Sequence, residues 1–111
     1  MPIANCYIKN KQVSQGELEE LAGKWAEKLH IDIKDICLTV LTDFTQVGQQ
    51  YEVMINLFLP SLWAEEDVKK IQKTLLELLK SYLKINSSEI FLITSIVQSG
   101  HVMENGKIAE W

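Results

Sequence analysis

Two apolar stripes with the 3.6-residue period of an α-helix are the clearest pattern along the chain. The first predicts a helix over residues 15–30, and Ser14 followed by Glu17 forms a capping box at its start. The second predicts a helix after Pro60, where Ser61 is the expected cap and an acidic run at residues 65–67 suits the positive helix end. The stripes consist of Leu18, Leu21, Ala22, Trp25, Ala26 and Leu29, and of Val68, Ile71, Leu75, Leu78, Leu79 and Tyr82.

Four apolar segments predict β-strands, at residues 2–8, 36–41, 51–59 and 90–97. Asn105-Gly106 predicts a type I′ turn that closes a small C-terminal hairpin, and residues 44–50 predict a turn or short hairpin. The third and fourth strands are apolar at successive positions, as expected where both faces of a sheet are covered. Because two helices can cover only one face, we expect further copies of the chain to cover the other.

The two halves of the chain resemble each other at an offset of 54 residues. Residues 29–38 match residues 83–92, the helix stripes shift by the same amount, and Ile3 falls opposite Leu57. Such self-similarity predicts a duplicated βαβ unit. We therefore expect one α+β domain over residues 1–111, with half-units of roughly 1–50 and 51–111. Its mixed four-stranded sheet would carry two helices on one face and end in a short hairpin.

Composition narrows the class of protein. The chain has 111 residues, of which 47% are hydrophobic, so it can form a packed core. A net charge of −4 without a basic cluster gives little support for nucleic-acid binding. We expect a cytoplasmic protein without a membrane partner, because no apolar run reaches membrane-spanning length and no secretory segment follows Met1.

Cysteine and histidine residues give no sign of a metal site. Cys6 and Cys37 lie in strand-like segments, which predicts reduced core residues. His30 ends the first helix and His101 lies in a loop, too far apart in the sequence for a convincing ligand set. We expect neither a metal nor a cofactor.

The second residue carries the most chemistry. Removal of Met1 would make Pro2 the N-terminal residue, with a free secondary amine. An α-amino group has a pKa of about 8, and an apolar site would lower that pKa. Such a base can take a proton from a carbon next to a carbonyl group.

These features together resemble the tautomerase superfamily, which includes 4-oxalocrotonate tautomerase (4-OT) and the macrophage migration inhibitory factor (MIF) family. Pro2-Ile3-Ala4, the duplicated βαβ unit and residues 83–92 carry the resemblance, and residues 102–106 also resemble the end of a small bacterial tautomerase-like family. The resemblance implies a homotrimer and an isomerase. Pro2 would be the general acid/base in keto–enol tautomerisation of a small carbonyl acid.

The resemblance also implies where substrate would bind. Short tautomerases hold the substrate carboxylate with arginines, but all eleven basic residues here are lysines. The family positions fall near Lys11 and Leu38, and we expect Lys9, Lys11 or Lys34 to hold the carboxylate. A tyrosine of the MIF family falls on Phe91, which we expect in the pocket.

Two other functions fit the same residues. Because the arginines are missing, the chain could be a non-catalytic oligomeric module that binds a small molecule or a partner. The order βαββαβ also fits a ferredoxin-like regulatory domain, whose two halves would pair into an antiparallel sheet.

Overall fold

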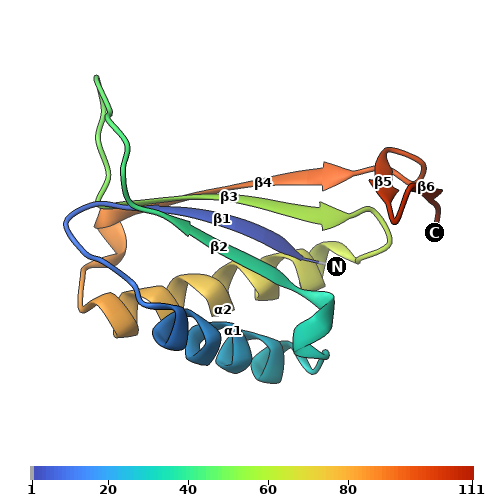
Figure 1. The fold of residues 1–111 in the computed structure, drawn as a ribbon, viewed down its shortest axis with the longest axis horizontal. Helices are drawn as coiled ribbons and strands as arrows, with labels where there is room; N and C mark the ends of the chain where they lie inside the picture. Colours follow the sequence, from blue (N-terminus) through green and yellow to red (C-terminus); the bar gives the residue numbers. More distant parts are fainter. Residues whose placement is uncertain (1) are drawn as a thin grey trace.

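A computed structural model describes residues 2–111. Two helices lie against one face of a four-stranded sheet, and a two-stranded hairpin follows beyond the end of that sheet (Figure 1). The helices are α1 (Gln15–Leu29) and α2 (Glu65–Leu83), and short 3-10 turns form η1 (Ile33–Asp35) and η2 (Ser87–Glu89). The strands are β1 (Ile3–Ile8), β2 (Cys37–Leu41), β3 (Val53–Pro60), β4 (Ile90–Val97), β5 (Val102–Glu104) and β6 (Lys107–Ala109).

The sheet has the order β2-β1-β3-β4. β1 and β2 are parallel, β3 and β4 are parallel, and β1 and β3 join the two pairs in antiparallel orientation. The predicted α+β fold with a mixed four-stranded sheet and a C-terminal hairpin is therefore confirmed. The ferredoxin-like alternative is wrong, because it requires an antiparallel sheet.

The helix ends repeat at the offset seen in the sequence. His30 and Lys84, which are 54 residues apart, both end a helix in the left-handed conformation, with φ of 58° and 56°. A 3-10 turn and then a strand follow each of them, so η1 and η2 are also 54 residues apart. This part of the predicted duplication is visible in the backbone itself.

The first strand of each half follows a different offset. Ile3 pairs with Cys37, and the equivalent pair in the second half is Met54 with Phe91. Ile3 therefore corresponds to Met54, and the expected match with Leu57 is wrong. Successive residues of a strand face opposite sides, so the three-residue difference would have turned Ile3 toward the wrong face.

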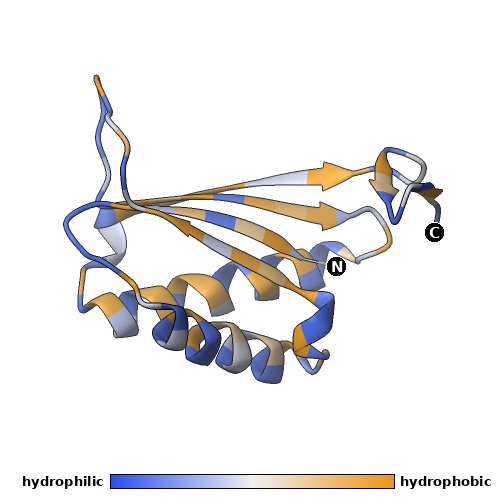
Figure 2. Cartoon of the chain, in the orientation of Figure 1, coloured by the Kyte–Doolittle hydropathy of each residue, from blue (hydrophilic) through white to orange (hydrophobic). Residues whose placement is uncertain are grey.

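The core lies between the sheet and the helices. Alternate residues of β1 and β3 are buried there against one stripe of each helix, and apolar residues run along the strands (Figure 2). Cys6 belongs to this core, and burial raises the pKa of its thiol to about 12. Cys37 is exposed instead, because it begins β2 on the opposite face, so its expected burial is wrong.

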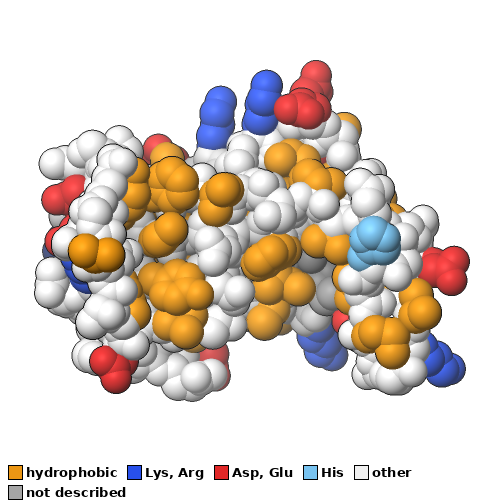
Figure 3. All heavy atoms as spheres, turned by 90° about the horizontal axis from the view of Figure 1, so that it is seen from above, with side chains coloured by type: hydrophobic (Ala, Val, Ile, Leu, Met, Phe, Trp, Pro, Cys, Tyr) orange, Lys and Arg blue, Asp and Glu red, His pale blue; other side chains and the backbone are white. Residues whose placement is uncertain are grey.

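The other face of the sheet carries no helix in the described chain (Figure 1), and hydrophobic side chains gather on it (Figure 3). Cross-strand pairing arranges its side chains in three rows, of which the outer two are mainly apolar and the central one is mainly polar. We call this the open face. The rows are Cys37, Ile3, Phe58 and Ser95; Thr39, Asn5, Asn56 and Ile93; and Leu41, Tyr7, Met54 and Phe91.

The helix starts differ in how they are capped. α1 begins with the predicted capping box, in which Ser14 and Glu17 exchange hydrogen bonds. α2 begins after Ala64, which has no side-chain cap, so the expected capping by Ser61 is wrong. Neither described helix has the length and apolarity to cross a membrane.

Candidate functional site at the start of β1

Pro2 lies at one end of the sheet, directly before the central strand β1. Its carbonyl oxygen accepts a hydrogen bond from the Cys37 amide at 2.9 Å, which fixes it beside the start of β2. The Pro2 side chain is fully buried. The antiparallel pairing of β1 with β3 brings the end of β3, and with it the end of β4, to the same end of the sheet.

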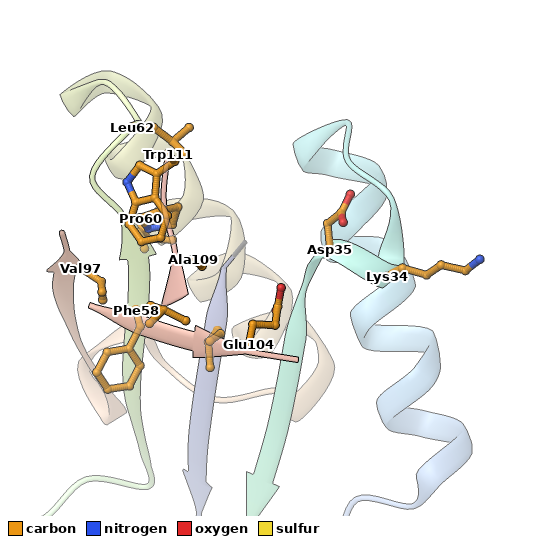
Figure 4. A pocket seen from close by; sticks show the side chains of 12 residues that line it. Lys34, Asp35, Phe58, Pro60, Leu62, Val97, Glu104, Ala109 and Trp111 are labelled. Atoms are coloured by element: carbon orange, nitrogen blue, oxygen red, sulfur yellow. The ribbon is translucent and has the colours of Figure 1, made fainter. Parts of the chain in front are cut away.

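A cavity of about 320 Å³ opens at this end of the sheet, and Ile3 forms part of its wall. This volume is at the lower end of the range for small-molecule sites. Most of the wall is apolar and comes from the ends of β3 and β4 and from the hairpin (Figure 4). These residues are Phe58, Leu59, Pro60, Val97, Val102 and Ala109, and Leu62 joins them from the segment between β3 and α2.

Trp111 adds an aromatic ring to the wall and is held by two serines. Its indole Nε1 donates to Ser61 Oγ at 3.0 Å, and its amide donates to Ser99 Oγ at 2.8 Å. A further backbone bond joins the Gly100 amide to the Ala109 carbonyl. These contacts fix the hairpin over the end of the sheet, so the ring is positioned by structure that is distant in sequence.

Among the described residues of the wall, the charged ones are Lys34, Asp35 and Glu104. Lys34 and Asp35 belong to η1, directly before β2, and Glu104 ends β5. The Lys34 side chain extends away from the other labelled side chains, whereas Glu104 extends from the hairpin toward the side where Asp35 lies (Figure 4). All three are exposed, so water screens their charges in part.

Two of the predicted substrate-binding lysines lie at the opposite end of β1. Lys9 and Lys11 follow the six residues of this strand, a separation of about 20 Å from Pro2 at the usual rise of a strand. Lys9 Nζ donates to Gln50 Oε1 at 2.7 Å, and Lys11 Nζ lies 4.8 Å from the centre of the Tyr82 ring. Within one protomer these ammonium groups are not near Pro2.

Phe91 also lies at that far end, near the start of β4. Its ring stacks on Tyr51, with the ring centres 5.0 Å apart. Of the four residues predicted to bind substrate, Lys34 is the one on the wall of this cavity, which includes Ile3 but not Pro2 itself.

Trp111, Asp35 and Glu104 were not predicted as site residues. Their placement depends on the hairpin folding back over the sheet, and no local motif signals that contact. Among residues 2–111, no group of three or more His, Cys, Asp and Glu side chains is arranged to hold a metal ion.

The comparisons with known proteins rest on structure alone, because no family model and no curated protein matches the chain by sequence. A fused 4-OT described as an asymmetric trimer aligns with a TM-score of 0.79 and 11% identity, over 96% of this chain and 95% of that one. MIF from Trichinella spiralis aligns with a TM-score of 0.71 and 15% identity, over 96% of both chains. A member of the cis-3-chloroacrylic acid dehalogenase family, N1, has a TM-score of 0.74 and 8% identity, over 96% of this chain and 82% of that one.

These structures share the architecture described above along nearly the whole chain. The chain therefore has the fold of the tautomerase superfamily, and the resemblance seen in the sequence is confirmed at the level of fold.

Proposed function

We propose that this protein is a tautomerase that uses Pro2 as its general acid/base. Removal of Met1 would leave the Pro2 nitrogen as a secondary amine at the end of the sheet where the wall of the neighbouring cavity is mostly apolar. The apolar part of these surroundings disfavours the protonated amine and lowers its pKa, whereas the carboxylates of Asp35 and Glu104 favour the protonated form. The single observation that supports this proposal most is the apolar cavity that begins one residue after Pro2.

In the proposed reaction, the Pro2 nitrogen takes a proton from the carbon next to the carbonyl group of the substrate. The C–H electron pair becomes the C=C bond of the enolate, and the protonated Pro2 nitrogen then gives up its proton to the oxygen, directly or through water, to form the enol. The reverse sequence returns the proton to carbon. The sequence expectation of a carbonyl acid as substrate needs a cation near Pro2, and Lys34 is the residue in the protomer closest to that role.

We also propose that copies of the chain assemble through the open face, as a homotrimer. The large side chains of Ile93, Met54 and Phe91 on this face would leave water on assembly. Structural relatives described as trimers support the number three. Cytoplasmic location stays a prediction, which fractionation of the native cell would check.

The test of the catalytic proposal begins with the intact mass of untagged protein, which we expect to lack Met1. The protein should then accelerate exchange of the benzylic protons of a phenylpyruvate-type substrate in D₂O, followed by NMR. A general base contributes about 10²- to 10⁴-fold, so Pro2→Ala should lose about 10²-fold or more in kcat/KM.

The matched control is a variant with two extra residues before Pro2, which turns the nitrogen into a non-basic amide. Exchange at the wild-type rate in this extended variant would exclude Pro2 as the base. The non-catalytic binding module would then be the better description.

A further inference from the structure

The cavity beside Pro2 is an unusual place for an anionic substrate. Asp35 and Glu104 bring two carboxylates to its rim, and the described lysine of the wall, Lys34, extends away from the other side chains (Figure 4). The chain has no arginine that could bind a carboxylate through two parallel hydrogen bonds.

The two other lysines near β1 contact side chains at the far end of this strand. Lys9 donates to Gln50, and Lys11 lies over the Tyr82 ring, both at the far end of the strand. A substrate carboxylate beside Pro2 would therefore lose hydration to apolar walls and would meet like charge at the rim.

An uncharged carbonyl compound has no charged group that would lose hydration or be repelled by the carboxylates at the rim. Its apolar part would contact Phe58, Pro60 and the ring of Trp111, which is held in place by Ser61 and Ser99. Its carbonyl group would lie toward the start of β1, where Ile3 joins the wall.

We infer that this pocket selects uncharged carbonyl compounds with an aromatic or branched apolar group over the corresponding carbonyl acids, and that Asp35 and Glu104 set this preference. The catalytic form of the inference rests on the proposed function of Pro2. The binding preference itself does not require Pro2 to act as a base.

The kinetic test compares phenylpyruvate with its methyl ester, which differ in charge and share the exchanging benzylic carbon. We expect kcat/KM for the ester to exceed that for the acid by about tenfold or more at low ionic strength, with a smaller ratio in high salt.

The double variant Asp35→Asn/Glu104→Gln should lower the ester-to-acid ratio at least threefold. The control Glu27→Gln/Glu77→Gln changes net charge equally on the exposed helix surface and should keep the ratio. An acid turned over as well as the ester, or a ratio unchanged in the pocket variant, would overturn the inference.

A binding test separates this inference from the catalytic proposal. The probes are 3-phenylpropanamide and 3-phenylpropanoate, and binding is followed through the NMR signal of the Trp111 indole N–H. Tighter binding of the amide supports the inference even if Pro2 proves inert, in which case only the proposed function fails. Equal or tighter binding of the carboxylate overturns the inference whatever Pro2 does.

Discussion

The hydroxyl of Tyr82 joins the two helices by donating a hydrogen bond to Glu17 Oε2, across 65 residues of sequence. This bond, with that from the Ser14 amide, lowers the pKa of the Glu17 carboxyl. The same bond, with burial and the charges of Glu17 and Glu20, raises the pKa of Tyr82 to about 12. The hydrogen bond therefore joins the start of α1 to the end of α2, and it is strongest when Glu17 is ionised and Tyr82 is neutral.

The direction of the pH dependence follows from these shifts. Because folding lowers the Glu17 pKa, its contribution to stability is present above the unfolded pKa and is lost as pH falls through the folded pKa. Because folding raises the Tyr82 pKa, its contribution is complete below the unfolded pKa of about 10 and is lost as pH rises toward 12. The contribution of the pair is thus greatest near neutral pH.

We predict that Tyr82→Phe raises the Glu17 pKa and lowers the urea midpoint most near neutral pH. The difference in urea midpoint between wild type and variant should shrink as pH falls below about 4, because protonation of Glu17 removes the charged acceptor of the Tyr82 hydrogen bond. Carboxyl NMR titration and urea unfolding across pH would measure both effects. Tyr51→Phe, which removes a hydroxyl from the ring stacked on Phe91, is the control. A pH-independent gap would contradict this account.

The C-terminal hairpin depends on a two-residue turn in which both φ angles are positive. Asn105 has φ of 53° and Gly106 has φ of 74°, so the type I′ turn predicted from the sequence is present. A Cβ added at Gly106 would find no heavy atom within 4 Å, so a substitution there meets backbone strain and not a clash.

We predict that Gly106→Ala destabilises the hairpin by about 1 kcal/mol, the usual cost of the left-handed conformation for a residue with a Cβ. Hydrogen exchange of the Gly100 amide, which bonds to Ala109 at 3.0 Å, should accelerate about fivefold, as that free energy implies. The control Gly23→Ala lies inside α1, also with open space around its Cβ. It should raise stability by roughly 0.5–1 kcal/mol. Unchanged exchange in Gly106→Ala would show that the turn conformation does not limit the hairpin.

Elements set by local patterns were predictable, and those set by distant contacts were not. The apolar stripe and capping box of α1 and the Asn105-Gly106 turn contain their own signals within a few residues. The exposure of Cys37 depends on which face β2 turns toward the helices, which the segment itself does not specify.

The candidate site shows the same division. Pro2 and Lys34 lie near the same end of the sheet because the start of β1 and the approach to β2 fix their positions, and their roles stay predictions. Ser61 is an example of a position that distant contacts decide. The sequence predicted it to cap α2, but its hydroxyl accepts a hydrogen bond from Trp111, fifty residues away. No signal in either segment indicates that partner.

For the whole molecule, the open face is the feature that a lone protomer leaves unexplained. Its central row places the amides of Asn5 and Asn56 opposite each other, with Ile93 at one end and apolar rows on both sides. A face that copies bury must provide hydrogen bonds for these amides, because unpaired buried polar groups are costly. The polar row therefore restricts the relative orientation of associating copies, while the apolar rows favour their association.

Ile93 offers a direct test of the proposed assembly. Its side chain is 51% exposed in the protomer and lies at the β4 end of the central row, so it contributes little to the protomer's own core. We predict that Ile93→Asp converts the trimer to a folded monomer at micromolar concentration, since an unpaired carboxylate in a contact between copies costs several kcal/mol. Light scattering after size-exclusion chromatography measures the mass, and circular dichroism checks the fold.

The control is Val47→Asp, because Val47 is 95% exposed and lies in the loop between β2 and β3. It adds the same charge away from the open face and should leave the mass unchanged. A wild-type protein of monomer mass would contradict the assembly, and a trimeric Ile93→Asp would place the contact elsewhere.

Because the cavity and the open face share Ile3 and Phe58, dissociation should also change turnover at Pro2. Measuring kcat/KM on the monomeric variant would then decide whether one protomer is sufficient for catalysis.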